Sequence, residues 1–545
     1  MPSAKTSLAF ALFFLLASVL QWRTGACVAE FGGHPDEPSH FITGLMVRDY
    51  VASLASSPPM EYAENYYLHY PRVALGHWPP VFYVVQGGWT LLFGPSRVSL
   101  MILMALLAAL LAVTVHKLIE AEYSYGAGLA AGSLLVSLPL MQSLTHAVMA
   151  ELVVALLCLW AAFCWGRYLD SGHWRYSAGF GLLAALAILT KGTGLALAWI
   201  PLLATLAARK LTLVRRPSFW APAVIVIALC APWYLLVPAA MHQSADNSLP
   251  TLGWAEPMSP LYGLGFVLLI QLTILIIPML AGWGVKVIGP MRRGAGASGK
   301  WAGLAALSVS LTLTSLWIGP ARDHRHMSLV MPALVMFTVA GSAWLFGRRP
   351  LRNLSSSAKT ALAVSLTVAM CVFNAFRSDP QPARGFSALA ADIMSQPRFD
   401  DAVMLVSSGG AGEGMLICEV ARRDRRPGRI VLRSSKVLAK SSWNGRTYEL
   451  HYKNPDEAGE FLRQVPVNLL ILDRTRSNPE AHHRILDELV RRRPDEWELI
   501  GEYPAEPLPG AEGRVAVYRQ RGAENRPRSE IRIDLTDRIG KVLSR

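Results

Sequence analysis

The chain has 545 residues, of which 52% are hydrophobic and only 17% are charged, and its mean hydropathy is +0.32. This balance excludes an ordinary water-soluble protein and places the chain in a lipid bilayer. The formal charge of +14 does not indicate nucleic-acid binding, because many Lys and Arg residues lie in short loops between apolar runs. Such loops are normally cytoplasmic, and contact with acidic lipid headgroups is a second explanation for the charge.

The first apolar run, SLAFALFFLLASVLQW, follows Lys5 and is long enough to cross the bilayer as a helix. A cleaved signal peptide is the alternative, but the run is long for one and further spans follow, so we expect an uncleaved helix. Apolar runs recur to about Phe376 and predict an all-α polytopic membrane bundle of 11 to 13 helices. Beyond the first, spans are predicted near residues 81–94, 98–117, 127–140, 145–165, 178–208 (one long helix or two short ones), 219–239, 262–284, 302–319, 326–347 and 359–376.

A polar, aromatic-rich segment at residues 25–80 separates the first two predicted spans. It is too long for a tight connection, so we expect an ordered outer loop. Within it, SHFITGLMVRDYVASLA places Phe41 and Leu45 at helical spacing. This spacing predicts an amphipathic helix on the membrane surface.

Two adjacent acids, Asp36 and Glu37, stand in this loop within the sequence HPDEPSH. A carboxylate at the membrane edge can take a proton from an acceptor hydroxyl or amine during a transfer reaction. The alternative is structural: Asp36 is a helix N-cap and Glu37 favours the helix dipole. The residues alone leave both explanations open.

The loop closes on the sequence HWPPVFY, which contains His77, Trp78 and Tyr83. These rings either form an interfacial aromatic belt or line a binding pocket.

Two ionisable residues interrupt later apolar runs, Glu151 in THAVMAELVVALLCLW and Lys191 in LAILTKGTGLALAW. Ionisable groups at membrane depth cost several kcal/mol, so they usually face a cavity or a partner. The alternatives are an interfacial position at a helix end for Glu151 and snorkelling towards the surface for Lys191.

A basic cluster, Arg322-Asp323-His324-Arg325-His326, abuts the apolar run MSLVMPALVMFTVA. Arginine forks match phosphate oxygens, so the cluster is a candidate phosphate clamp. A cytoplasmic positive-inside anchor explains the same charges.

From about Arg377 the sequence becomes charged, with β-like runs AVMLVSS, RIVLRSS, NLLILDR and VAVYRQR and a helical stretch PEAHHRILDELVRRR. This alternation predicts that a membrane domain over 1–376 is followed by a small soluble α/β domain over 377–545, ending in a polar tail. SSGGAGEG at 407–414 lacks the Walker lysine and a proper GxGxxG, so a strand-to-helix turn is favoured over a phosphate loop. Four of the six cysteines lie in apolar runs; Cys27 and Cys418 are expected to be solvated, and spacing alone does not support a disulfide between them.

The order of these features resembles the GT-C membrane glycosyltransferases, specifically the branch with the dolichyl-phosphate-mannose protein mannosyltransferases and the bacterial lipid A aminoarabinose transferase. It runs from an acidic pair after the first helix through a PP-aromatic motif, a later acid, LTKG, PWY and a basic motif, over about residues 1–376. The resemblance places Asp36 on the family's acidic loop position, with Glu37 beside it. Other positions that it implies are Glu151 as a second cavity acid, Lys191 in the TKG motif, and Arg322, His324 and Arg325 near the carrier phosphate. One departure is Trp78, where the family usually has Lys; His77 is the candidate substitute.

The resemblance implies an integral-membrane glycosyltransferase that moves a sugar from a polyprenyl-phosphate carrier to a lipid, glycan or protein acceptor at the outer face of the cell inner membrane. Its expected partners are this donor, the acceptor and membrane lipids. No cofactor is expected, and no metal, because no compact Asp/His/Asp cluster is visible in the sequence. The alternatives are a transporter or flippase of a lipid-linked substrate, and a non-catalytic assembly or sensor protein on the same scaffold.

Overall fold

The computed structural model describes residues 3–237, 265, 275–318, 324–348, 351–381, 383–441, 448–465, 467–475, 479–505, 512–523, 532–534 and 542–544. The chain separates into two compact units. We call the first the helical unit; it comprises Met1–Thr24, Gly76–Phe82 and Met101–Asp379. We call the second the loop-and-sheet unit; it comprises Gly25–Leu75, Tyr83–Leu100 and Pro380–Arg545. The outer loop thus belongs with the C-terminal sheet, a grouping that the order of the segments along the chain does not predict.

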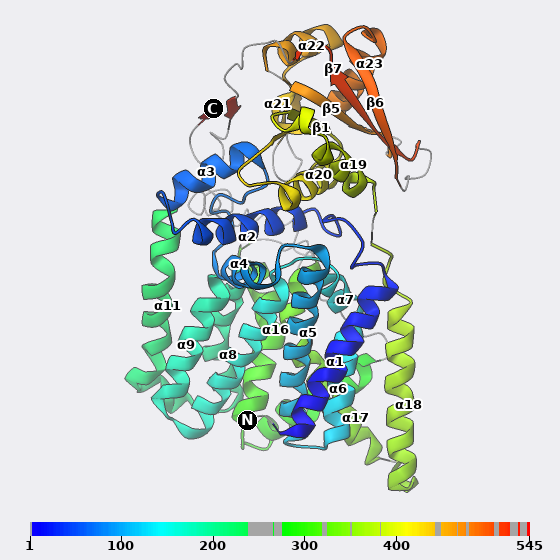
Figure 1. Ribbon diagram of the computed structural model, residues 1–545. Helices are drawn as coiled ribbons and strands as arrows, with labels where there is room; N and C mark the ends of the chain where they lie inside the picture. Colours follow the sequence, from blue (N-terminus) through cyan, green and yellow to red (C-terminus); the bar gives the residue numbers. More distant parts are fainter. Residues whose placement is uncertain are drawn as a thin grey trace. The chain divides into compact units, whose positions relative to one another are not determined.

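The helical unit is built from apolar helices that pack along their lengths. α8 contacts α9 and α16, α9 contacts α11, and α14 contacts α17; Figure 1 shows α8, α9 and α11 side by side. The elements are α1 (Ala4–Arg23), α5 (Arg97–Glu120, whose first residues belong to the other unit), α6 (Tyr125–Ser137), α7 (Pro139–Thr145), α8 (Glu151–Ser171), α9 (Trp174–Ile188), η1 (Gly192–Trp199), α10 (Ile200–Ala207), η2 (Leu211–Arg215), α11 (Pro217–Leu236), α14 (Ile276–Trp283), η5 (Gly284–Ile288), α15 (Gly289–Arg292), α16 (Gly299–Ile318), η6 (His324–Leu329), α17 (Met331–Phe346), η7 (Leu351–Asn353) and α18 (Ser356–Ala375).

Five described helices are long and apolar enough to cross a membrane alone: α1, α5, α8, α11 and α18. A sixth span results if α6 and α7, which are bent by 67°, count as one. The predicted run at 178–208 is broken, because α9 ends at Ile188 and η1 begins at Gly192. Part of the predicted span at 262–284 lies outside the described residues. The predicted fold class of a helical membrane bundle with a small α/β domain is confirmed, and the total of 11 to 13 spans stays a prediction.

The C-terminal sheet has the strand order β2-β1-β5-β7-β6. Its strands are β1 (Val403–Ser407), β2 (Ile430–Arg433), β5 (Val467–Asp473), β6 (Trp497–Pro504) and β7 (Arg514–Gln520). β2, β1 and β5 are parallel, whereas β7 is antiparallel to both β5 and β6. The four predicted β-runs are β1, β2, β5 and β7. The edge strand β6 is not among the predicted runs, because Glu498, Gly501 and Glu502 interrupt its apolar residues and only Trp497 is fully buried.

Helices and short strands complete the loop-and-sheet unit. They are α2 (Glu37–Ala52), α3 (Pro59–His69), α4 (Val81–Phe93, whose first two residues belong to the other unit), α19 (Phe386–Ser395), η8 (Pro397–Phe399), α20 (Gly410–Arg423), α21 (Ser434–Val437), β3 (Ala439–Ser441), β4 (Tyr448–Leu450), α22 (Pro455–Gln464), α23 (Ala481–Arg492), β8 (Arg532–Asp534) and β9 (Val542–Ser544). The predicted helix PEAHHRILDELVRRR is α23. Within the predicted polar tail, β8 and β9 form an antiparallel pair.

Three further expectations have clear outcomes. The predicted surface helix exists as α2, but it is buried continuously from Glu37 to Leu45, so this half has no one-sided apolar face. The glycine-rich segment is a strand-to-helix turn, as predicted, because β1 ends at Ser407 and α20 begins at Gly410. Cys418 is buried, contrary to the prediction that it is solvated, and all six cysteines, each within the described ranges, are free thiols.

Candidate functional site

The helical unit contains a buried ion cluster centred on Glu151. Glu151 is the first residue of α8 and is 2% exposed. Lys191 lies in the break between α9 and η1, is 6% exposed, and donates from Nζ to Glu151 Oε1 at 2.5 Å. Lys191 therefore points to a buried carboxylate, which does not support snorkelling. Glu151 is likewise inside the unit, which does not support an interfacial position.

Arg325 brings a second cation to the same carboxylate. It lies on η6, and its Nε is 3.3 Å from Glu151 Oε1. Three elements that are distant in sequence thus bring two cations to one carboxylate. Because these two cations lie in a poorly solvated environment, they favour the approach of an anion. This arrangement favours the phosphate-clamp explanation for Arg325 over a loop anchor.

The segment that contains His77 and Trp78 lies beside this cluster. The backbone N–H of Val81 donates to the carbonyl of Leu189 at 3.0 Å, two residues before Lys191. Trp78 is 9% exposed, and its ring lies edge-on to that of His77 with centroids 5.1 Å apart. Trp78 is therefore packed inside the protein, so a lipid-facing belt does not account for it.

Asp36 belongs to the loop-and-sheet unit, where it stands at the N-cap position of α2 and is 7% exposed. Within the described helix, its side chain makes no capping hydrogen bond. His34 Nδ1 accepts the Asp36 backbone N–H at 3.1 Å and lies 3.9 Å from Asp36 Oδ2. The capping explanation is therefore not supported, and Asp36 stays a candidate for chemistry.

Glu37 has a different environment from its neighbour. Its Oε1 accepts a hydrogen bond from Arg97, and its Oε2 accepts the backbone N–H of Gly33 at 2.8 Å. Arg97 also donates to the Ala26 carbonyl at 2.8 Å and lies over the Phe31 ring, 5.0 Å from its centroid. Both carboxylate oxygens of Glu37 thus hold the loop together. These contacts favour a structural role for Glu37, and its assignment as a catalytic residue stays a prediction.

Arg97 is a residue that sequence reasoning missed. It stands directly before an apolar run, where a basic residue is normally interpreted as an interfacial anchor. Its proximity to the buried Glu37, 60 positions earlier, is visible only in three dimensions.

Tyr83 supports the first turn of α2. Its hydroxyl and His40 Nδ1 are 2.9 Å apart, and both residues are buried. The backbone N–H of His40 in turn donates to the Asp36 carbonyl at 3.0 Å. Tyr83 is thus connected through His40 to the residue that carries the candidate carboxylate.

The remaining predicted site residues are described only in part. His324 is half-buried on η6, and Arg322 lies outside the described residues. Across the described ranges, no group of three His, Cys, Asp or Glu side chains is placed to hold a metal ion.

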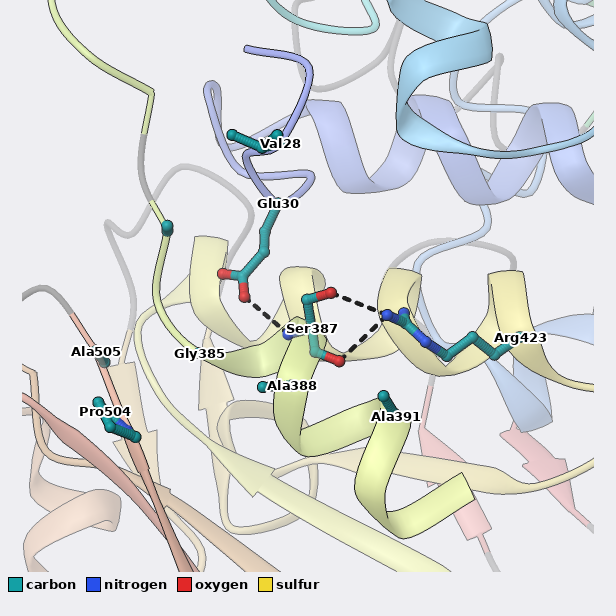
Figure 2. A pocket seen from close by; sticks show the side chains of 10 residues that line it. Val28, Glu30, Gly385, Ser387, Ala388, Ala391, Arg423, Pro504 and Ala505 are labelled. Atoms are coloured by element: carbon teal, nitrogen blue, oxygen red, sulfur yellow. Dashed lines mark hydrogen bonds between the residues drawn. The ribbon is translucent and has the colours of Figure 1, made fainter. Parts of the chain in front are cut away.

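A shallow hollow of about 580 Å³ in the loop-and-sheet unit is lined by residues that include Val28, Glu30, Ser387 and Arg423. Figure 2 shows that its polar groups bond to one another: the Ser387 backbone N–H donates to Glu30, and Arg423 donates to Ser387. We assign no ligand to this hollow.

The fold of this chain, a bundle of apolar helices with a small C-terminal α/β domain, is similar to that of solved membrane glycosyltransferases. The chain matches ArnT from Cupriavidus metallidurans in the apo state with a TM-score of 0.59 at 15% identity, covering 95% of this chain and 98% of that one. It matches the same protein bound to undecaprenyl phosphate with a TM-score of 0.54 at 15% identity, covering 96% and 99%.

More distant similarity extends to an archaeal enzyme. The oligosaccharyltransferase AglB from Archaeoglobus fulgidus, in complex with an inhibitory peptide and a dolichol-phosphate, matches with a TM-score of 0.51 at 12% identity, covering 86% of this chain and 69% of that one. In sequence, the family model of the dolichyl-phosphate-mannose-protein mannosyltransferases matches residues 77–235. This segment includes Trp78, Glu151 and Lys191. None of the curated proteins matches this sequence. The predicted resemblance to this branch of the GT-C glycosyltransferases is confirmed.

Proposed function

We propose that this chain is an integral-membrane glycosyltransferase. It takes a sugar from a polyprenyl-phosphate carrier and transfers it to a lipid, glycan or protein acceptor at the outer face of the cell inner membrane, with the C-terminal domain also outside the cytoplasm. The structures of ArnT bound to undecaprenyl phosphate and of AglB with dolichol-phosphate support a lipid-phosphate donor. The similarity of fold favours this function over a transporter.

The observation that carries the proposal is the buried cluster of Glu151, Lys191 and Arg325. When the bond between the sugar and the carrier breaks, negative charge grows on the departing phosphate. Preorganised cations in a poorly solvated site stabilise such a charge without having to reorganise. In this mechanism Lys191 and Arg325 interact with the phosphate, and Glu151 holds both cations in place.

The acceptor must lose a proton as it attacks the sugar. Asp36 is the proposed general base, because a carboxylate can accept this proton or orient the acceptor group. Attack of the acceptor on the anomeric carbon, opposite the departing phosphate, would invert the configuration of the sugar. We propose that neither a nucleotide sugar nor a metal ion is needed, since the donor is already activated and the two cations supply the positive charge.

The test is a transfer assay. Purified protein in lipid nanodiscs is incubated with a panel of radiolabelled polyprenyl-phosphate sugars and with membrane extracts as the source of acceptors. The expected result is label on one acceptor class from one donor, and no label with Asp36→Asn. Folded wild-type protein that transfers label from no donor in the panel would overturn the proposal.

A further inference from the structure

The outer loop of the loop-and-sheet unit packs closely on helix α20. A methyl group built on Gly414 would lie 2.5 Å from Cγ and 2.6 Å from Cβ of Pro38, closer than carbon atoms can approach. Cys418, one turn further along α20, donates from Sγ to the Pro38 carbonyl at 3.6 Å. Met415 fills the space next to Gly32, where a side chain would overlap it. We call Gly414, Met415 and Cys418 the docking face of α20.

The docking face contacts the loop on both sides of the candidate carboxylate. Gly32 precedes Asp36 by four residues, and Pro38 follows it by two. Between them, the Gly33 N–H donates to Glu37, and the Glu37 N–H donates to the His34 carbonyl at 3.0 Å. The backbone that carries Asp36 is therefore a compact turn seated on α20.

A second attachment fixes the loop before this turn. The Glu30 carboxylate accepts the backbone N–H groups of Arg384 and Ser387, each at 2.8 Å, at the start of α19. Arg423 of α20 donates to the Ser387 hydroxyl and carbonyl at 2.9 and 3.2 Å (Figure 2). Burial raises the pKa of Glu30, while the backbone donors oppose this rise.

A third attachment involves the C-terminal half of α2 and the segment that follows it. Arg426 donates from Nε to Asp49 at 2.6 Å, and the Tyr70 hydroxyl donates to Asp424 at 2.9 Å. His69 Nδ1 and the Gly428 carbonyl are 2.7 Å apart. The loop is thus attached to the C-terminal part of the chain before, at and after the turn with Asp36.

We infer that the docking face of α20 is a positioning element for the transfer reaction, with Gly414 as the residue that sets where Pro38, and hence the Asp36 carboxylate, lies. This inference rests on the proposed function. It gives the C-terminal domain a role in the reaction through backbone placement, without contact with the substrate. It also explains the glycine-rich segment, which is not a phosphate loop: alanine is the better helix former, but only glycine leaves room for the Pro38 ring.

The test compares two identical substitutions in one helix. Gly414→Ala is expected to displace Pro38, whereas Gly410→Ala places its methyl 3.8 Å from Arg72 Nη2 and meets no other described atom within 4 Å. For Gly414→Ala we expect kcat to fall by about 10²-fold, because small misplacements of reacting groups are that costly, with the donor KM within about twofold of wild type. Gly410→Ala should match wild type.

A second measurement does not depend on activity. Hydrogen exchange of the amides of Gly33, Glu37 and His40 reports the turn directly, since all three N–H groups donate within it. Gly414→Ala should exchange these amides faster while the protein stays folded, since one overpacked methyl typically costs only part of a domain's stability. The double variant Gly414→Ala/Pro38→Gly lacks the overlapping ring, so slow exchange and kcat should both be restored. If Gly414→Ala damaged only α20, the Pro38→Gly substitution would restore neither.

The outcomes separate the two proposals. If Gly414→Ala behaves as Gly410→Ala does while Asp36→Asn is inactive, the positioning role is overturned and the proposed function stands. A loss of kcat with unchanged exchange of the three amides also overturns it. If wild-type protein transfers no sugar, the proposed function fails and the positioning role fails with it, while the exchange data still report whether α20 holds the loop.

Discussion

Lys191 donates a hydrogen bond to Glu151, 40 positions earlier in the chain, at 2.5 Å. Each residue alone is an ionisable group that interrupts an apolar run. A helix-end position for Glu151 and snorkelling for Lys191 explain the sequence as well as a functional role does. Together, and with Arg325 at 3.3 Å from the same oxygen, they are one buried cluster with two cations and one acid. Two cations held at one buried carboxylate are an arrangement that favours the binding of a phosphate.

Replacement of Asp36 by Asn should abolish transfer and leave stability unchanged. General acid–base groups typically contribute about 10²–10⁴-fold to a rate, so kcat should fall within that range or below detection. A lost helix cap would instead cost about 0.5–2 kcal/mol of stability with activity preserved, but Asp36 makes no such cap in the described helix. The turnover rate and melting temperature of the purified variant decide between a catalytic role and a capping role. A variant that turns over as fast as wild type would contradict the catalytic role.

Replacement of the neighbouring Glu37 by Gln should have the opposite effect. Removing one partner of a buried ion pair leaves the other charge uncompensated, so we expect a loss of about 3–5 kcal/mol in the free energy of unfolding. The double variant Glu37→Leu/Arg97→Met removes both charges and should be considerably more stable than Glu37→Gln. Melting in nanodiscs measures both. A Glu37→Gln protein as stable as wild type would contradict the structural role.

The sequence predicts the apolar helices and four strands of the sheet because their signals are local: run length, period and turn residues. It also singles out Asp36, Glu151 and Lys191 as candidates, because the order of motifs resembles a family, and their roles stay predictions. It does not predict the pairing of Asp49 with Arg426, 377 positions away, or of Glu37 with Arg97. Such contacts depend on how distant segments pack. The pattern of charges along the sequence does not show which basic residue pairs with a given acidic residue.

Removal of single charges from the helical cluster should separate function from stability. Lys191→Met leaves Glu151 with Arg325, so the protein should melt near wild type while kcat falls by about 10²–10³-fold, as for loss of one donor to a developing charge. Glu151→Gln leaves two cations without their carboxylate and should lower the melting temperature markedly. The double variant Lys191→Met/Glu151→Gln should be more stable than Glu151→Gln alone but should remain inactive. A Lys191→Met protein with wild-type kcat would remove Lys191 from the mechanism.

A topology experiment tests the side of the membrane on which the chemistry occurs. Lys5 before the first helix predicts a cytoplasmic N-terminus, and the proposed function needs the outer loop and the sheet on the far side. We therefore expect an odd number of spans. Alkaline phosphatase fused after Arg545 should be active and green fluorescent protein at the same point dark. The reverse pattern would refute this orientation.

The last prediction concerns Arg325 of η6, whose guanidinium lies beside the carboxylate of Glu151. If Arg325 stabilises the departing phosphate, Arg325→Ala should raise the barrier to transfer by about 2 kcal/mol or more, which is roughly a 30-fold loss of rate. Arg325→Lys should recover only part of the loss, because an ammonium cannot make the two parallel bonds of a guanidinium.

The matched control for Arg325 is Arg348, an exposed arginine of the same unit that lies over the Trp344 ring. Arg348 has the features of an interfacial anchor, so Arg348→Ala and Arg348→Lys should leave kcat and KM unchanged. If Arg325 were also only an anchor, lysine would replace it fully and its two variants would behave like those of Arg348. Single-turnover kinetics with a saturating polyprenyl-phosphate sugar measure the chemical step alone. A clear loss with Arg325→Ala, partial recovery with Arg325→Lys and no loss with either Arg348 variant would assign Arg325 to the leaving phosphate, whereas full recovery by lysine would exclude that role.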